Sequence, residues 1–523
     1  MDSSALFAGV RLDKKRFAAD IKRFKRKKDP SFDNAAYDST IEMKQEIHSL
    51  FNPEESIEGA KKRVKKNRDE AAENVNVFTA SMVPTGVLKP EVQEQERVGA
   101  KKIEVAGVLR KKYRIHVSGD NVPAPLIGFE QLHSQYGCKR YLITNIIDAG
   151  YKEPTSIQRQ AIPVLLEGRE CFACAPTGSG KTLAFMLPII MRLKVPSKAG
   201  IRALVLSPTR ELALQITKEF KKLAYGRKFR IRLLTKALAK CVDLKDLPCD
   251  ILVSTPLRLH YLIRESKIDL SCVEYFVLDE SDKLFEMGFI QQIDSVVNAC
   301  GNPSIVRSLF SATLPDYVEE LARTIMHDAV RIIIGEKNSA SQTVKQQLVF
   351  VGSEEGKLLA IRQFLEGLQP PVLVFVQSKD RARELHKELA FDGIHVDSSH
   401  ADRTQAQRES AVEKFREGKT WVLITTDVMC RGMDFKGVNC VINYDFPQTT
   451  STYIHRIGRS GRAGRPGKAV TFYTESDVPF LRPIANVMKA SGINVPSWML
   501  SLPKRIRKHP LGRDPIEKKG VQF

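Results

Sequence analysis

The 523-residue chain lacks the long apolar run that a membrane-spanning helix requires. Although 42% of its residues are hydrophobic, no stretch approaches the run of about 18 apolar residues that such a helix needs. Residues 1–10 also lack the charged-then-apolar layout of a secretory signal. We therefore expect an intracellular protein without membrane association.

The nine cysteines lack the spacing of a disulfide framework. Cys171 and Cys174 form a single C-x-x-C pair, but no second pair or nearby histidine completes a zinc site. Two small core residues of a buried strand explain this pair more simply. The pattern favours a reducing compartment and argues against metal or redox chemistry at these cysteines.

Negative charge is in short supply, because 61 acidic residues accompany 82 lysines and arginines, for a formal net charge of +21. Such an excess indicates a polyanionic partner, most often nucleic acid. Basic clusters at 22–28 and 61–68 lie in a segment without a sustained apolar period. We expect a basic, largely disordered N-terminal extension over 1–120, with these clusters either solvated or serving RNA contact or nuclear import. A basic, flexible tail is expected over 492–523.

Two stretches alternate apolar strands with amphipathic helices. The first covers 121–336, and a small, polar linker at 337–343 separates it from the second at 344–491. Near-continuous apolar runs between helices are typical of parallel sheets covered on both faces, so the predicted fold class is α/β with two tandem domains. The predicted strands are 171–175, 203–207, 230–234, 251–254, 275–278, 307–310 and 331–334, then 347–351, 372–376, 394–397, 421–425, 440–443 and 469–473.

One octapeptide joins a predicted strand to a predicted helix and has the features of a phosphate-binding loop. Its residues are Ala175, Pro176, Thr177, Gly178, Ser179, Gly180, Lys181 and Thr182. The glycines allow the backbone to approach an anion, and the helix N-terminus adds positive partial charge. Lys181 is then placed for the β- and γ-phosphates of a nucleotide, and the Thr182 hydroxyl for a magnesium ion. The alternative is a glycine-rich turn without special chemistry, because the general pattern has glycine where this chain has Ala175.

Two consecutive carboxylates, Asp279 and Glu280, follow the predicted strand at 275–278. Ligands bind at the carboxyl ends of strands in open α/β sheets. One carboxylate can hold magnesium through its hydration shell while the next positions or deprotonates the attacking water. A helix cap is the commoner role for such a group alone. The phosphate loop earlier in the same stretch favours the catalytic interpretation.

The second stretch has no phosphate loop of its own but carries four arginines among glycines at 455–465. Arg459 and Arg462 have the spacing to reach one polyphosphate side by side. Their positive charge would neutralise the negative charge that develops as a γ-phosphoryl group leaves. A solvated helix face is the alternative, but it gives no reason for glycines that weaken a helix.

In order, these motifs resemble those of the DEAD-box ATP-dependent RNA helicases over about residues 129–490. The matching segments are the Q motif at 150–158, motif I at 175–182, motif Ia at 208–212, the name-giving tetrad at 279–282, motif III at 311–313, motif V at 426–427 and 431–434, and motif VI at 455–462. The resemblance implies two RecA-like domains, a monomeric core, and the cofactors ATP and Mg²⁺.

The resemblance also implies roles for individual residues. Gln158 and Tyr151 would contact adenine, and Asp434 the ATP ribose. The residues expected to couple the two domains are Asp282, Ser311, Thr313 and His455. Those expected to touch the RNA sugar-phosphate backbone are Arg210, Thr255, Arg258, Arg408 and Thr426. Contacts of this kind predict RNA binding with little sequence preference and with an affinity that depends strongly on salt. The RNA 2′-hydroxyl would allow the protein to distinguish RNA from DNA.

Some positions depart from the family pattern. Leu257 stands where glycine is usual, residues 234–237 replace a glycine pair, and the spacer between Phe129 and Tyr151 is long. Ser281 replaces alanine in the tetrad, a small change that should leave hydrolysis intact. The altered tetrad, the missing glycine pair and the basic extension resemble a nucleolar subgroup that acts in small-subunit ribosomal RNA processing. That subgroup implies pre-ribosomal RNA and pre-ribosomal proteins as partners, and the nucleus and nucleolus as the location.

Three alternatives stay open at the level of sequence. The chain could be an ATP-gated RNA clamp or scaffold, a helicase for another RNA class such as pre-mRNA, or a DNA helicase of the same superfamily. Glu280 and the intact segment 311–313 favour turnover, but no residue distinguishes strand separation from clamping.

Overall fold

The computed structural model describes residues 5–7, 10–11, 103–241, 248–338, 343–427, 435, 437–461 and 466–503. The basic clusters at 22–28 and 61–68, most of the expected tail and residues 339–342 of the expected linker lie outside these ranges. None of the described helices combines the length and apolar character that crossing a bilayer demands.

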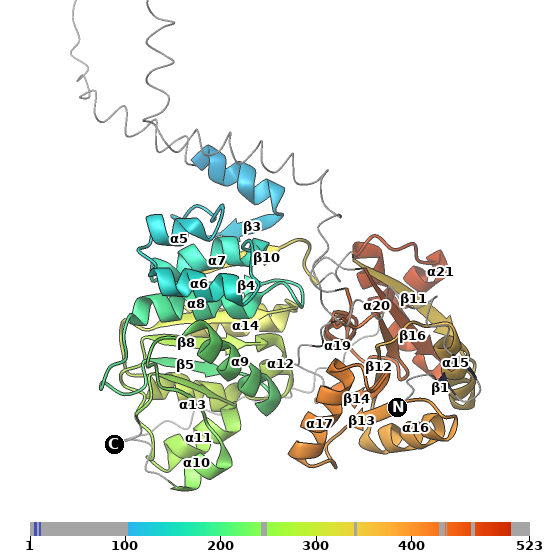
Figure 1. The fold of residues 1–523 in the computed structure, drawn as a ribbon. Coiled ribbons are helices and arrows are strands. Elements are labelled where there is room, and N and C mark those ends of the chain that lie inside the picture. The colour runs from blue at the N-terminus through green and yellow to red at the C-terminus, as the bar shows by residue number, and fades with distance from the viewer. Residues whose placement is uncertain are drawn as a thin grey trace, which may run out of the picture. The chain divides into compact units, whose positions relative to one another are not determined.

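An eight-stranded sheet organises the first α/β part of the chain (Figure 1). In spatial order its strands are β3 (Ile115–Ser118), β10 (Val330–Ile334), β4 (Cys171–Cys174), β9 (Val306–Ser311), β8 (Tyr275–Asp279), β5 (Ala203–Leu206), β7 (Ile251–Ser254) and β6 (Ile231–Leu233). Neighbouring strands are parallel, except that β3 runs antiparallel to β10. The prediction of a parallel sheet from near-continuous apolar runs is confirmed.

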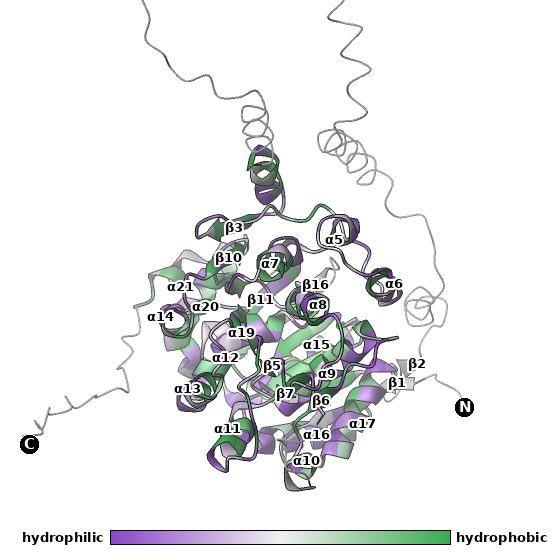
Figure 2. Cartoon of the chain, turned by 90° about the vertical axis from the view of Figure 1, so that its left-hand side faces the viewer, coloured by the Kyte–Doolittle hydropathy of each residue, from purple (hydrophilic) through white to green (hydrophobic). Residues whose placement is uncertain are grey.

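Helices cover both faces of this sheet. They are α5 (Glu130–Ser134), α6 (Arg140–Asp148), α7 (Ser156–Leu166), α8 (Lys181–Leu193), α9 (Arg210–Leu223), α10 (Lys236–Cys241), α11 (Pro256–Arg264), α12 (Ser281–Glu286), α13 (Ile290–Ala299) and α14 (Asp316–Ile325). Along β8, Tyr275 and Val277 belong to one buried cluster and Phe276 and Leu278 to the other. Because successive side chains of a strand point to opposite faces, this alternation buries both sides of the sheet. Figure 2 colours the strands largely as hydrophobic, whereas the covering helices carry both colours.

A six-stranded, fully parallel sheet organises the second part. Its strands in spatial order are β11 (Val344–Phe350), β16 (Gly467–Tyr473), β15 (Cys440–Asn443), β12 (Val372–Val376), β14 (Val422–Thr426) and β13 (Val396–Ser399). The helices that accompany it are α15 (Glu354–Glu366), α16 (Lys379–Phe391), α17 (Gln405–Arg416), α19 (Thr450–Ile457), α20 (Val478–Ala490) and α21 (Ser497–Ser501), with a 3₁₀ turn, η1 (Glu475–Asp477). A short antiparallel pair, β1 (Ala5–Phe7) with β2 (Val10–Arg11), lies near the start of the chain.

The structure differs from the sequence-based expectations at the two outer limits of the α/β stretches. Strand β3 and a helix over 103–112 lie within the segment expected to be an extension. Only Ile115 of β3 is buried, because an edge strand packs little of its length, so the segment carries no apolar signal. At the other limit, Met499 of α21 is buried in the core of the second part, inside the segment expected to be a tail.

A buried ion-pair network ties together the starts of several strands in the first sheet. Asp250 precedes β7 and is fully buried. Its carboxylate accepts hydrogen bonds from Arg230 Nε at 2.9 Å, Arg202 Nη2 at 3.2 Å and the backbone N–H of Ser197 at 2.9 Å. Burial alone would raise the pKa of Asp250, but the bonds from Arg230, Ser197 and Arg202 lower it to about 2. The carboxylate therefore stays charged at neutral pH.

We expect Asp250→Asn to lower the free energy of unfolding by about 3 kcal/mol, because the substitution leaves two arginines without their buried counter-charge. Urea unfolding measures this loss. Asp328→Asn is the matched control, since its ion pair with Arg169 lies at the surface and contributes no more than about 1 kcal/mol. Equal losses in the two variants would contradict the assigned role of the network.

Candidate nucleotide and nucleic-acid site

The loop between β4 and α8 depends on two glycines in the left-handed region of backbone space. Gly178 has φ +77° and Gly180 has φ +83°. A Cβ atom added at Gly180 would overlap the side-chain amide of Gln158. Glycine is therefore required at 180 for both its conformation and its close contact.

Gln158 joins the loop to the start of α7. Its Nε2 donates to the carbonyl of Gly180 at 3.0 Å, and its Oε1 accepts from the backbone N–H of Thr155 at 3.0 Å. The Thr155 hydroxyl donates to the carbonyl of Ser179 at 2.7 Å. Each end of the Gln158 amide thus makes one bond within the protein and keeps a second N–H and a second lone pair for an adenine edge. Tyr151 is partly buried against the core of the first part.

Lys181, the first residue of α8, is held inside the loop. Its Nζ donates to the carbonyls of Ala175 at 2.6 Å and Pro176 at 3.1 Å. Burial lowers the pKa of Lys181, although the charge of Asp279 acts in the opposite direction. An anion arriving in the loop would supply counter-charge and exchange with the two carbonyls. Thr182 follows and is partly exposed.

Asp279 and Glu280 stand at the carboxyl end of β8, and both are buried. Burial raises the pKa of Asp279 to about 7, and the neighbouring charge of Glu280 adds to the shift. Glu280 has φ +50°, which is uncommon for a residue other than glycine and directs the chain sharply into α12. Such strain is typical of residues held in place for function.

Asp282 is the most heavily bonded carboxylate of the tetrad. Its Oδ2 accepts from the backbone N–H of Thr313 at 3.1 Å, from the Thr313 hydroxyl, and from His455 Nε2 at 2.9 Å. Burial alone would raise the pKa of Asp282, but His455 and Thr313 lower it well below its ordinary value. Ser311 supports the same turn, since its hydroxyl donates to the carbonyl of Thr313 at 2.6 Å.

One side of α19 and the turn after it carries several contacts between the two parts of the chain. His455 meets Asp282, and Arg459 Nη2 lies 3.7 Å from Glu280 Oε1. The Thr177 hydroxyl donates to the carbonyl of Gly458 at 3.2 Å, and a Cβ at Gly458 would overlap that hydroxyl. The phosphate loop and the carboxylates thus meet a single helical segment of the second part.

The residues expected to touch RNA lie near the carboxyl ends of strands. Arg210 is the exposed first residue of α9, and Thr255 directly precedes α11, with Arg258 in its first turn. Arg408 lies in the first turn of α17, and Thr426 ends β14. Helix α11 forms regularly although Leu257 replaces glycine, and the Leu257 side chain is exposed. Phe129, by contrast, is buried in the core of the first part.

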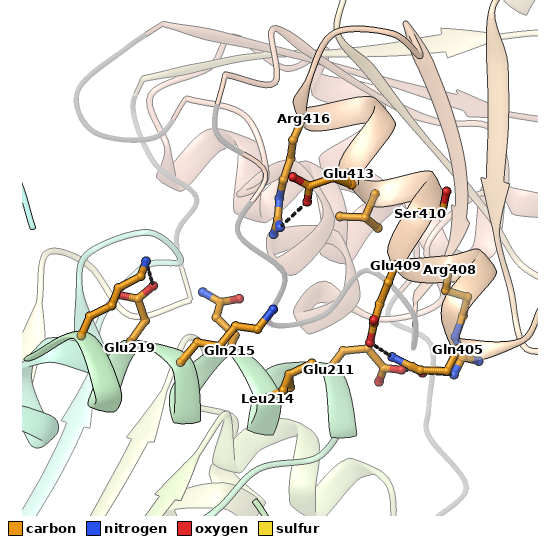
Figure 3. Close-up of a pocket in the computed structure, with 13 residues that line it drawn as sticks. Glu211, Leu214, Gln215, Glu219, Gln405, Arg408, Glu409, Ser410, Glu413 and Arg416 are labelled. Carbon is orange, nitrogen blue, oxygen red and sulfur yellow. Dashed lines mark hydrogen bonds and ion pairs between the residues drawn. The ribbon is translucent and has the colours of Figure 1, made fainter. Parts of the chain in front are cut away.

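A cleft of about 660 Å³ lies between α9 and α17. Charged and polar side chains of the two helices face one another across it, as Figure 3 shows. Arg408 Nη2 lies 3.4 Å from Glu211 Oε1 and donates to Gln405 Oε1 at 2.5 Å. A carboxylate next to Arg210 therefore holds Arg408, and a nucleic-acid phosphate at Arg408 would compete with that carboxylate.

Two predicted site residues, Asp434 and Arg462, lie outside the described residues. Three contacts were missed from the sequence: Thr177 with Gly458, Arg408 with Glu211, and the bidentate pair in which Arg456 donates to both oxygens of Asp427 at 2.6 and 2.8 Å. Each joins residues inside or beside predicted motifs. No spacing or periodicity in the sequence indicates these pairings.

The assembled groups suit a polyphosphate and a hydrated divalent cation. The Ser179 hydroxyl and Glu280 Oε2 are buried and have no hydrogen-bond partner among the described residues, which is the condition expected where a ligand supplies the partner. Within that part of the chain, no group of three or more His, Cys, Asp or Glu side chains could hold a metal ion by itself. A cation here would depend on water and phosphate oxygens for most of its ligands.

Two protein-family models match the chain. The DEAD/DEAH box helicase model covers residues 155–321, and the helicase conserved C-terminal domain model covers residues 356–464. The first match contains the phosphate loop and the carboxylate tetrad, and the second contains His455 and Arg459.

Full-length relatives and solved structures agree with these matches. DEAD-box ATP-dependent RNA helicase 57 of Oryza sativa subsp. japonica is 58% identical over 528 residues, which span 98% of each protein. Probable ATP-dependent RNA helicase DDX52 of Mus musculus is 45% identical over 567 residues, covering all of this chain and 95% of the mouse protein. The structure of S. cerevisiae Dbp5 bound to RNA and ADP BeF3 superposes with a TM-score of 0.63 at 29% identity, over 71% of this chain and 95% of Dbp5.

We expect His455 to titrate above its ordinary pKa of 6.5. Burial alone would lower its pKa, but the contact with Asp282 raises it. The stabilisation that protonated His455 gives this contact is therefore present below pH 6.5 and is lost as the pH rises through the raised pKa. Asp282→Asn removes the carboxylate charge and leaves the burial, so the pKa of His455 should then fall below 6.5. NMR titration of ¹³C-histidine-labelled protein measures both values.

His455→Gln identifies the signal, and the remaining histidine signals serve as internal controls. A His455 midpoint that does not respond to Asp282→Asn would show that the two side chains are apart in solution.

Proposed function

Because this chain belongs to the DEAD-box ATP-dependent RNA helicase family, we propose that the site described above is its ATPase centre. The chain is an RNA-dependent ATPase built from two RecA-like α/β domains. The observation that carries the residue assignments is that one side of α19 meets both the phosphate loop and the carboxylates. The family membership favours an RNA helicase over the scaffold and DNA alternatives.

In this proposal the phosphate loop holds ATP. Thr177, Gly178 and Gly180 offer backbone N–H groups to the phosphates, and Lys181 turns from the loop carbonyls to the β- and γ-phosphates. Gln158 reaches the adenine edge with its second N–H and its second lone pair, with Tyr151 beside the ring and Asp434 at the ribose. Gln158 would thereby link the bound base to the phosphate loop through its bond to the carbonyl of Gly180.

We propose that Thr182 and, through water, Asp279 hold Mg²⁺ together with the ATP phosphates. Bound magnesium would neutralise charge on the phosphate oxygens. Its positive charge would also keep Asp279 ionised, although burial raises the pKa of that carboxyl to about 7. Glu280 has a buried oxygen that no described residue bonds, and we assign this carboxylate to orient and deprotonate the attacking water.

We assign the coupling between the two domains to Asp282 and the residues that contact it. Ser311 and Thr313 hold the turn after β9, and His455 reaches Asp282 from α19. Arg459 now lies near Glu280, and with Arg462 it would stabilise the charge on the departing phosphoryl group. Hydrolysis would remove the γ-phosphoryl group that both domains share, so the domains separate and release RNA.

RNA binding is assigned to Arg210, Thr255, Arg258, Arg408 and Thr426. A phosphate at Arg408 would displace Glu211, which makes RNA a competitor for an existing contact between the two domains. The solved structure of Dbp5 with RNA and ADP BeF3 supports a site in which RNA and nucleotide are bound together. Backbone contacts of this kind predict unwinding of short duplexes, or remodelling of RNA–protein contacts, with little sequence preference.

We expect Lys181→Ala and Glu280→Gln each to reduce RNA-stimulated phosphate release by about a hundredfold or more, because each removes a group that acts on the reacting phosphates. Lys181→Ala should also weaken nucleotide binding, whereas Glu280→Gln should retain it. Phosphate release with and without RNA, together with binding of a fluorescent ATP analogue, separates the two effects.

Far-ultraviolet circular dichroism controls for folding in both variants, and a strand-displacement assay beside the ATPase assay distinguishes unwinding from clamping. Near-normal turnover in either folded variant would reject the assignment of that residue.

We further propose that the substrate is small-subunit pre-ribosomal RNA, bound with pre-ribosomal proteins in the nucleolus. The support is the Asp-Glu-Ser-Asp tetrad at 279–282, the replacement of the usual glycine pair at 234–237, and the net charge of +21. These features resemble a nucleolar subgroup of the family.

Depletion of the protein should cause unprocessed small-subunit precursor RNA to accumulate, because the proposed remodelling step would no longer occur. Northern analysis of precursor RNA measures this, and large-subunit precursors serve as the control. Normal small-subunit precursor levels, or a tagged protein excluded from the nucleolus, would reject the ribosomal assignment and leave the ATPase assignment untouched.

A further inference from the structure

Ser451 makes a contact across the two domains that no catalytic motif accounts for. Its Oγ lies 3.2 Å from the hydroxyl oxygen of Thr313, and the serine is 6% exposed. Ser451 stands four residues before His455, so the two side chains share one face of α19. That face therefore meets the Asp282–Thr313 pair at two points, one turn apart.

The hydrogen bond between the two hydroxyls runs from Thr313 Oγ1 to Ser451 Oγ. The Thr313 hydroxyl shares its single hydrogen with the carboxylate of Asp282, which lies closer, at 2.5 Å, and is the stronger acceptor. Ser451 Oγ is therefore the second acceptor for the Thr313 hydroxyl. The resulting chain runs from Ser451 through Thr313 to Asp282, which His455 also contacts.

Ser451 is not required to begin its own helix. The cap of α19 is Thr449, whose hydroxyl accepts from the backbone N–H of Thr452 at 3.0 Å. The Ser451 hydroxyl is directed instead to the first domain, so this contact exists only while the two domains are together.

We propose that Ser451 is a positioning residue for ATP hydrolysis. It acts through Thr313 to keep the Asp282 carboxylate in hydrogen-bond contact with His455. This inference rests on the proposed ATPase function and deepens it. A hydrogen-bond partner from the second domain fixes the Thr313 hydroxyl, and the fixed hydroxyl keeps Asp282 oriented toward His455. Four residues beyond His455, Arg459 is then held near Glu280. Ser451 thus acts on the RNA-stimulated step, when the domains are closed, and not on ATP binding to the first domain.

Ser451→Ala should lower kcat at saturating RNA by about fivefold, the effect of losing one neutral hydrogen bond. ATP affinity without RNA should stay at the wild-type value, because the phosphate loop is unchanged. Ser451→Thr retains the hydroxyl and should recover most of the lost kcat. Thr450→Ala, which removes the neighbouring partly exposed hydroxyl of α19, is the matched control and should match the wild type.

A double-mutant cycle tests the route through Thr313. If Ser451 acts only through that hydroxyl, the double variant Ser451→Ala with Thr313→Ala should be no slower than Thr313→Ala alone. Additive losses in the double variant, or a wild-type kcat in Ser451→Ala, would overturn the proposal. A melting temperature lowered equally in Ser451→Ala and Ser451→Thr, with equal loss of kcat, would also overturn it by showing a packing defect. If the wild-type protein showed no RNA stimulation, the proposed function itself would fail, which is a separate result.

Discussion

The carboxylate of Asp282 is the interaction on which the two halves of the site depend. It is fully buried and takes hydrogen bonds from Thr313 within its own domain and from His455 in the other. A buried carboxylate with so many donors is stable only while those donors are present, since an unpaired charge in the interior is costly. The position of α19 is therefore energetically coupled to the turn after β9. This coupling brings Arg459 near Glu280.

The phosphate loop is held by the protein itself. Lys181 binds two loop carbonyls, and Gln158 fastens Gly180 to the start of α7. Among the residues assigned to RNA, Arg408 is likewise held by an ion pair with Glu211. A phosphate therefore meets a lysine or an arginine that already has a partner, and its binding there proceeds by exchange. Exchange reduces the net affinity but avoids leaving a buried charge unpaired in the absence of ligand.

Much of this site could be predicted from sequence because its parts are local. The strand–loop–helix around Lys181, the carboxylates after β8 and the glycine-rich arginine segment each follow from residue types within a few positions. Most of the strands were predicted for the same reason, since they are short apolar runs. Strand β3 was missed because only one of its residues is buried, and α21 because Met499 is its single buried residue. The β3 segment is not apolar enough to stand out from its basic, polar surrounding, and α21 is too short to show a helical period.

The sequence by itself determined which chemical groups the site contains, because motif identity depends on residue types at fixed short spacings. Only the tertiary structure decided which of those groups meet. Thr177 with Gly458, Glu211 with Arg408 and Ser451 with Thr313 join residues that are far apart in the chain. Hydroxyls, carboxylates and arginines are common, and any of them could pair with many others. The pairing is set by the packing of two separate sheets and by the one face that α19 presents, and no local pattern encodes that choice.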